Sequence, residues 1–330
     1  MTEQVDRLVS GPQVVRDPSL PDRVTIYEVG ARDGLQNEDA SVPTAVKVGL
    51  VERLLDAGLP YVEATSLVHP RWVPQLADAE EVLTALVKRL GDRARDLPVL
   101  VPNERGLERA YDLGLRHIAV FASATDTFAR KNLNRSLDEQ YTMFEPVITR
   151  ARAAGMRVRA YVSMCFGDPW EGDVPLDQVV AAGKRLMDLG ATELSLGDTI
   201  GVGTPGHVVA LLDALNDAGL PDDVLALHAH DTYGQALGNV AAALRHGVTT
   251  FDTSVGGLGG CPYAESATGN LATEDLVWML DGLGISTGVS LPRLVETSAW
   301  LEPHLGHAPV SRAYQALRPA QPAVSTTSRT

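Results

Sequence analysis

The chain is poor in several features that define other classes of protein. Its 330 residues include only two cysteines, Cys165 and Cys261, which is too few for a disulfide framework or a cysteine-rich zinc site. No apolar run reaches the roughly 18 residues that a membrane span needs. Basic residues number 28 against 42 acidic ones, which gives a net charge of −14. We therefore expect a cytoplasmic protein that binds neither nucleic acid nor a membrane.

The two ends of the chain do not have the composition of packed structure. Residues 1–22 mix charges without an apolar core, and we interpret them as a loose N-terminal arm rather than a secretory signal. Residues 306–330 are rich in Ala, Pro, Ser and Thr, which predicts a flexible C-terminal tail. Residues 23–305 are long enough to form one large domain.

From residue 23 onward, strand-like and helical segments alternate eight times. The expected strands are short apolar runs at 24–27, 61–64, 98–101, 117–121, 157–162, 193–196, 224–228 and 249–253. Most of the helical segments between them end at a glycine, which favours the left-handed turn at a helix C terminus. Eight alternating units predict a (β/α)8 TIM barrel of class α/β, and 291–301 predicts one extra helix. The alternative, an open doubly wound sheet, lacks its Gly-x-Gly-x-x-Gly motif here.

Two histidines stand two residues apart at the end of the seventh expected strand. His228 and His230 should point to the same face, because side chains alternate along a strand. Two neutral imidazoles placed in this way can bind one divalent metal ion. The alternative is a pair of core histidines whose ring nitrogens bond to the backbone.

Polar residues follow other strands as well, and function in a barrel of this kind sits at the strand ends. Arg32 and Asp33 follow the first strand and suit an oxyanion and a hard metal ion, or a simple surface ion pair. Glu63 ends the second strand among apolar neighbours, so it needs a buried partner such as Arg32. Asp198 is a candidate for a proton relay or for a turn cap. Asp-Thr recurs at 198–199, 231–232 and 252–253, and capping is the simple explanation.

Four of these strand-end residues would make a metal site with two nitrogen and two oxygen ligands. They are Asp33, His228, His230 and Asn270. Such a set suits Mg²⁺ or Mn²⁺ better than zinc, and it leaves room for a chelating substrate. A glycine-rich stretch nearby has the composition of a mobile flap. Its Cys261 is either a catalytic candidate or an inert small residue.

Five strings of the sequence resemble the 3-hydroxy-3-methylglutaryl-CoA (HMG-CoA) lyase family. They are Arg32–Glu38, Glu63–Ser66, Ser195–Pro205, His228–Gln235 and Gly257–Tyr263. The resemblance covers about residues 23–290. It implies retro-Claisen cleavage of HMG-CoA, or of a close 3-hydroxy-3-alkylglutaryl-CoA, to acetyl-CoA and acetoacetate or the matching 3-keto acid. It also implies a homodimer. A synthase of the same barrel group, which runs the condensation, is the alternative.

The resemblance also implies roles for the site residues. The four candidate ligands would surround Mg²⁺ or Mn²⁺, Arg32 would stabilise the enolate oxygen, and Glu63 would hold Arg32 in place. Cys261 would lie in the flap that closes on the substrate. The base that takes the hydroxyl proton stays open among His228, Asp33 and Cys261.

Contacts with the acyl-CoA substrate are expected from several strand-end loops. For the acyl portion we expect Arg32, Gln36, Ser66, Ser163 and Thr199. For the CoA phosphates we expect Arg130, Lys131 and Asn132, unless that basic stretch is only a solvated loop. The loop at 162–172 departs from the family pattern, since Cys165 is displaced by one position and Asp168 and Trp170 replace a cysteine and a tyrosine. The identity of the substituent at C3 of the substrate is therefore left open.

Overall fold

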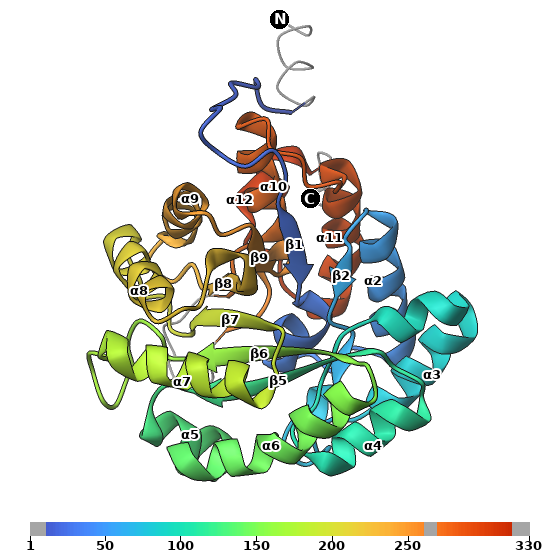
Figure 1. Ribbon diagram of the computed structural model, residues 1–330. Helices are drawn as coiled ribbons and strands as arrows, with labels where there is room; N and C mark the ends of the chain where they lie inside the picture. Colours follow the sequence, from blue (N-terminus) through green and yellow to red (C-terminus); the bar gives the residue numbers. More distant parts are fainter. Residues whose placement is uncertain (1–10, 261–268, 319–330) are drawn as a thin grey trace, which may run out of the picture.

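The computed structural model describes residues 11–260 and 269–318, and within them nine parallel strands form one sheet surrounded by helices (Figure 1). The candidate flap residue Cys261 lies outside the described residues. The sheet has the order β2-β1-β9-β8-β7-β6-β5-β4-β3. The strands are β1 (Thr25–Glu28), β2 (Tyr61–Val62), β3 (Thr65–Ser66), β4 (Val99–Leu100), β5 (His117–Ser123), β6 (Arg157–Ser163), β7 (Glu193–Asp198), β8 (Leu225–Ala229) and β9 (Thr250–Thr253).

The sheet closes into a barrel because its two end strands, β2 and β3, belong to one short segment. Between them, the backbone N–H of Glu63 donates to the carbonyl of Glu28 at 2.8 Å. The next N–H, that of Ala64, donates to the carbonyl of Pro98 on the other side at 3.0 Å. The expected second strand is therefore one barrel strand that changes partner at Glu63. This confirms the predicted eight-unit barrel.

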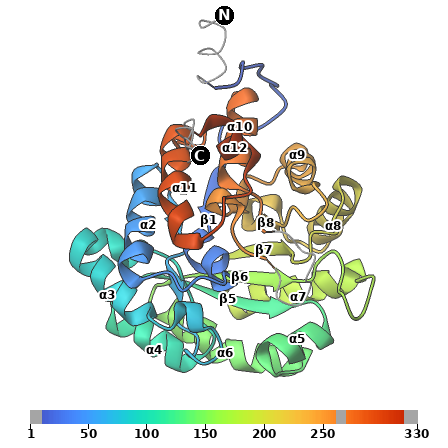
Figure 2. The ribbon, with the colours of Figure 1, turned by 180° about the vertical axis from the view of Figure 1, so that it is seen from behind.

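Helices cover the outside of the strands on all sides (Figures 1 and 2). They are α2 (Thr44–Asp56), α3 (Ala79–Leu90), α4 (Glu104–Asp112), α5 (Asp126–Leu133), α6 (Leu137–Ala153), α7 (Leu176–Leu189), α8 (Pro205–Asp217), α9 (Ala236–His246), α10 (Thr273–Gly282), α11 (Leu291–Leu305) and α12 (Arg312–Leu317). The main apolar core lies between this layer and the strands. None of the helices in the described ranges is long and apolar enough to cross a membrane.

Local signals set the helix ends. α6 begins with a capping box, in which the Ser136 hydroxyl accepts from the N–H of Glu139 and the Glu139 carboxylate accepts from the N–H of Ser136. α7 ends at Gly190, whose φ of 114° is a conformation that side chains disfavour.

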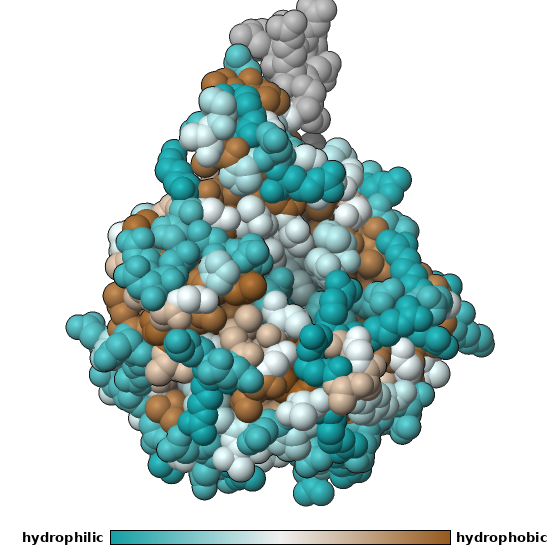
Figure 3. All heavy atoms as spheres, viewed as in Figure 1, coloured by the Kyte–Doolittle hydropathy of each residue, from teal (hydrophilic) through white to brown (hydrophobic). Residues whose placement is uncertain are grey.

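The face in Figure 3 is mainly hydrophilic, and its apolar residues form small scattered patches.

The structure differs from the predicted flexible tail over residues 306–318. Ser311 is the N-cap of α12, and its hydroxyl donates to the Asp275 carboxylate on α10 at 2.8 Å. The N–H of Ala313 donates to the same carboxylate at 2.7 Å, and Tyr314 is buried. A few such contacts order a segment whose average composition predicts disorder. The candidate CoA contacts Arg130, Lys131 and Asn132 lie on a helix, α5, and the alternative of a solvated loop is therefore wrong.

The centre of the barrel is polar. Arg159 on β6 is buried with its guanidinium carbon 3.8 Å from the centroid of the Tyr27 ring, and it forms ion pairs with Glu193 and Asp252. The guanidinium also lies 5.2 Å from the ring of Tyr161. These charged and aromatic side chains lie inside the barrel and support the residues at the carboxyl ends of the strands.

Candidate active site

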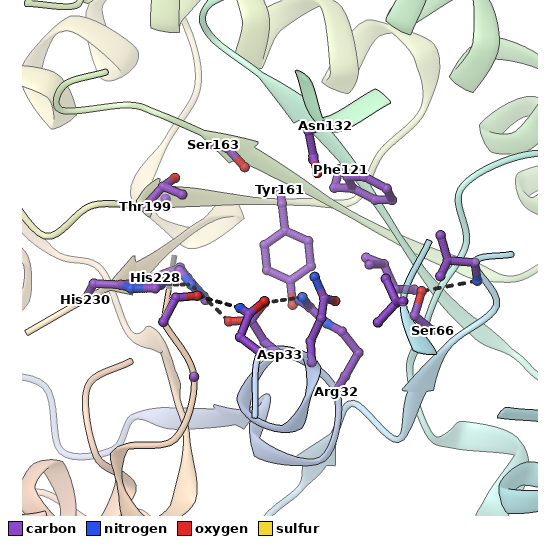
Figure 4. Close-up of a pocket in the computed structure, with 18 of the residues that line it drawn as sticks. Arg32, Asp33, Ser66, Phe121, Asn132, Tyr161, Ser163, Thr199, His228 and His230 are labelled. Carbon is purple, nitrogen blue, oxygen red and sulfur yellow. Dashed lines mark hydrogen bonds and ion pairs between the residues drawn. The ribbon is translucent and has the colours of Figure 1, made fainter. Parts of the chain in front are cut away.

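A pocket of about 690 Å³ opens at the carboxyl ends of the strands. Many of the residues predicted from the sequence line it (Figure 4), namely Arg32, Asp33, Gln36, Ser66, Asn132, Ser163, Thr199, His228 and His230. Glu63, Asp198, Asn270, Arg130 and Lys131 do not line it. Figure 4 shows Arg32 and Asp33 on the segment after β1, with Tyr161 facing them and the two histidines beside Asp33.

Arg32 is held by contacts on several sides. It lies in η1 (Gly30–Gly34), a single π-helical turn directly after β1. Its Nε donates to Glu63 Oε1 at 2.5 Å, and its Nη1 forms an ion pair with Asp33. The Tyr161 hydroxyl donates to the other Glu63 oxygen at 2.5 Å. The expected Arg32–Glu63 contact is therefore present, and the Arg32–Asp33 pair is largely buried and is not the simple surface pair of the alternative.

These carboxylates also set the charge of Arg32. Burial alone would lower the pKa of the guanidinium, but Glu63 and Asp33 raise it, so the group stays protonated. Asp33 responds in the opposite sense. Burial alone would raise its pKa, but Arg32 and the two histidines lower the pKa to about 2. The pocket thus contains a fixed cation beside a fixed anion.

Asp33, His228 and His230 form a compact group in which the candidate ligand atoms all lie within 4.8 Å of one another. The two Nε2 atoms are 3.3 Å apart, and His228 Nε2 lies 4.0 Å from Asp33 Oδ2. Asn270 joins this group, because its Nδ2 donates to Asp33 Oδ2 at 2.9 Å. Its buried Oδ1 accepts no hydrogen bond from the described residues. A buried acceptor beside a carboxylate and two imidazoles fits a hard or borderline divalent cation.

A residue that the sequence reasoning missed fixes the orientation of His228. Its Nδ1 lies 3.2 Å from Oδ2 of Asp252, which also accepts from the Ser195 hydroxyl at 2.7 Å. Burial alone would raise the pKa of Asp252, but Arg159 lowers it below the usual range. The ionised carboxylate requires a proton on Nδ1 and leaves Nε2 free to bind a metal. This contact disfavours the alternative of backbone-bonded core histidines.

Asp198 organises a turn. Its two oxygens accept from the N–H groups of Val202 at 2.9 Å and Gly203 at 3.0 Å. Burial raises the pKa of this carboxyl to about 6, and the backbone donors only partly offset the effect. These contacts support the turn-cap alternative, and the predicted catalytic role stays a prediction.

The loop that departs from the family pattern is held by its own differing residues. Cys165 is buried and its thiol donates to the carbonyl of Val162 at 3.1 Å, and burial raises the pKa of the thiol well above its usual range. Asp168 accepts from the Thr125 hydroxyl at 2.6 Å and from the N–H of Trp170 at 2.7 Å. Neither residue lines the pocket, whereas Ser163 from the same region does.

The three candidate CoA contacts lie on α5 and differ from one another. Asn132 lines the pocket. The exposed Arg130 pairs with Asp126 at 2.5 Å on the same helix. The Lys131 ammonium lies 4.7 Å from the centroid of the Trp170 ring. Only the position of Asn132 directly favours a contact with a ligand in the pocket.

Comparisons with known proteins show which sequences and structures this chain is similar to. The mitochondrial hydroxymethylglutaryl-CoA lyase of Bos taurus is 50% identical over 298 residues, which cover 90% of this chain and 90% of the relative. The crystal structure of the HMG-CoA lyase of Bacillus subtilis superposes with a TM-score of 0.86 at 45% identity, covering 90% of this chain and 98% of that one. An HMG-CoA lyase of Acinetobacter baumannii, solved with coenzyme A and 3-methylmalate, gives 0.85 at 33% identity, covering 93% and 99%. The family described as HMGL-like matches residues 23–301, and the chain therefore belongs to the HMGL-like family.

Proposed function

We propose that the protein is a metal-dependent carbon–carbon lyase that cleaves HMG-CoA to acetyl-CoA and acetoacetate. The observation that carries this proposal is the protonated Arg32 held next to the Asp33–His228–His230 group in one pocket. The names of the similar lyases support it, and they favour the lyase over the condensing synthase.

Asp33, His228, His230 and Asn270 would hold Mg²⁺ or Mn²⁺. A divalent cation bound there supplies Lewis acidity to a chelating hydroxyl, which lowers the pKa of that hydroxyl. Two features support this ligand set. Asn270 Oδ1 has no hydrogen-bond partner within residues 11–260 and 269–318, and the Nε2 atoms of His228 and His230 lie close together.

Arg32 acts on the charge that develops when the bond between C2 and C3 breaks. The hydroxyl proton leaves, a ketone forms at C3, and the electron pair of the broken bond moves onto the thioester as an enolate. The guanidinium, oriented by Glu63 and Tyr161, stabilises that oxyanion until C2 takes up a proton. The product of that protonation is acetyl-CoA.

The contacts narrow the choice of base. Asp33, with its low pKa, is a weak base. His228 uses Nδ1 to donate to Asp252 and has Nε2 turned toward the other metal ligands. Cys261, the third predicted candidate, lies outside the described residues and stays a prediction.

The test is a cleavage assay on purified protein stripped with EDTA and then supplied with MgCl₂ or MnCl₂. We expect acetyl-CoA and acetoacetate to form from HMG-CoA in equal amounts, and only with the cation. His230→Ala should lose its affinity for Mn²⁺ and, with it, the cation-dependent cleavage. If metal-bound protein forms no acetyl-CoA from HMG-CoA, the named substrate is wrong, and thioesters with larger C3 groups are the next to assay.

The homodimer and the cytoplasmic location stay predictions. The location is supported by the low cysteine content, which suits a reducing compartment.

A further inference from the structure

Glu28, the last residue of β1, connects three segments through one buried carboxylate. Its neighbour Tyr27 faces Arg159 inside the barrel, so Glu28 faces outward, under the helical layer. Oε1 accepts from the N–H of Gly30 at 2.7 Å and from the N–H of Val255 at 2.9 Å. Oε2 accepts from the hydroxyl of Thr273 at 2.6 Å. These donors are all neutral, so the carboxylate acts here as a shared acceptor and not as half of an ion pair.

Each of the three segments leads to a residue of the metal-ligand group or its immediate support. Gly30 begins η1, which carries Arg32 and Asp33. Val255 begins η5 (Val255–Gly257), after which the carbonyl of Leu258 accepts from Asn270 Nδ2 at 3.1 Å. Thr273 begins α10, three residues after Asn270. The segment that carries Asp33 therefore starts at this carboxylate, and the segment that carries Asn270 ends at it.

Glycines let these segments pack backbone against backbone. A Cβ atom added to Gly30 would lie 2.5 Å from Glu28 Oε1, and one added to Gly34 would lie 2.7 Å from Ser254 Oγ. A Cβ atom added to Gly259 would lie 2.6 Å from Asn270 Nδ2. Without intervening side chains, the spacing between the segments depends on the hydrogen bonds that join them.

We propose that Glu28 is a positioning residue of the active site, which sets the placement of Asp33 relative to Asn270 by holding together the start of the first segment and the end of the second. Its effect on turnover rests on the proposed function. Its effect on metal affinity does not, because cation binding can be measured without substrate.

A matched pair of variants tests the link. Thr273→Val removes the hydroxyl that joins α10 to Glu28 and keeps the side-chain shape. Ser298→Ala removes the hydroxyl that donates to Glu274, the equally buried glutamate on α10. Both variants remove one hydroxyl donor from a buried carboxylate. Only Thr273→Val removes a hydrogen bond that joins the segments of Asp33 and Asn270.

The readout is Mn²⁺ affinity by titration calorimetry on the full chain, with kcat and KM for HMG-CoA measured alongside. Glu28→Ala should weaken Mn²⁺ binding about 10–100-fold, as the loss of other supports behind metal ligands does. It should also lower kcat by about 10²-fold with little change in KM, because misplacing the catalytic groups slows the reaction more than it weakens substrate binding. Glu28→Gln should be much milder, since an amide oxygen still accepts from Gly30 and Val255. Thr273→Val should weaken Mn²⁺ binding, and Ser298→Ala should keep wild-type affinity.

Three results would overturn the proposal. They are wild-type Mn²⁺ affinity in folded Glu28→Ala, equal losses in Thr273→Val and Ser298→Ala, and a loss in Glu28→Gln as large as in Glu28→Ala. If Glu28→Ala does not fold, the hydroxyl pair decides the question. If the wild-type protein does not cleave HMG-CoA, the proposed function is wrong. The Mn²⁺ affinities of the variants still test the positioning role of Glu28 in that case.

Discussion

Single atoms of Asp252 determine which nitrogen of His228 can bind a metal. One oxygen of Asp252 faces Arg159, and the other faces His228 and the Ser195 hydroxyl. A guanidinium can only donate, so the oxygen beside it must be an acceptor. The oxygen beside His228 is therefore the one that an amide nitrogen would replace in an asparagine variant.

Asp252→Asn should consequently weaken Mn²⁺ binding by about 10–100-fold. The new amide nitrogen would donate to Nδ1, which moves the ring proton to Nε2, the atom that faces Asp33. Calorimetric titration measures the affinity, and ¹⁵N spectra of the histidine rings report the tautomer. Ser195→Ala is the control, because it removes a donor from the same carboxylate and keeps the charge. Unchanged affinity with the proton still on Nδ1 would refute this role.

At the same residue scale, the sequence predicted the residues at strand ends better than those within strands. Arg32, Asp33 and the two histidines were found because strand ends meet at one rim of a barrel. The support of His228 by Asp252 was missed because the Asp-Thr pair at 252–253 was explained by capping, and Tyr161 was missed because it lies within a strand. The signal for Tyr161 was present in Arg159, Tyr161 and Ser163, a polar alternation that marks one inward face.

At the scale of elements, long amphipathic segments were predictable and short ones were not. The extra helix predicted at 291–301 lies within α11, and a helix, α7, lies between the strands predicted at 157–162 and 193–196. The split of the second strand at Glu63 was not visible, because the change of partner depends on neighbours far along the chain. α12 has six residues, too few for a periodic pattern, and its stability comes from contacts with α10.

Asp275→Ala should therefore release α12 from α10. The carboxylate accepts from the Ser311 hydroxyl and from the N–H groups of Arg312 and Ala313. Losing such a cap typically costs about 0.5–2 kcal/mol. Denaturant unfolding measures the free energy, and amide hydrogen exchange should show faster exchange over residues 311–318. Wild-type protection in this segment would mean that α12 is held by other contacts.

At the scale of the whole molecule, burial of acidic groups makes stability depend on pH. Burial raises the pKa of Glu28 and of Glu274 to about 7, although both accept hydrogen bonds that oppose the shift. Between their usual pKa of 4.5 and that value, the folded protein binds more protons than the unfolded chain. Stability from these groups must therefore fall as the pH rises through this window.

His246 acts in the same direction. Burial alone would lower its pKa, but contacts with Asp213 and Asp222 raise it above the usual 6.5. Its contribution is present below that usual value and is lost as the pH rises through the raised one. Asp33 has the opposite dependence, but its contribution is lost only as the pH falls from about 4 toward its pKa of about 2.

The metal-free protein should accordingly melt at a higher temperature at pH 5.5 than at pH 7.5, by several degrees. Calorimetry in EDTA measures this, because bound metal would add its own pH dependence. Glu28→Gln should flatten the slope, since an amide does not titrate. A melting temperature that rises from pH 5.5 to pH 7.5 would show that these buried groups do not determine how stability depends on pH.

The central claim is that Arg32 stabilises the enolate while a separate group of ligands binds the cation. Arg32→Met measured for Mn²⁺ affinity and for turnover of HMG-CoA on the same preparation tests it most directly. We predict that Mn²⁺ affinity stays close to that of the wild type. Turnover should fall by about 10²–10³, the cost of removing one preorganised charge. Retention of both turnover and Mn²⁺ affinity near wild-type levels would contradict the account.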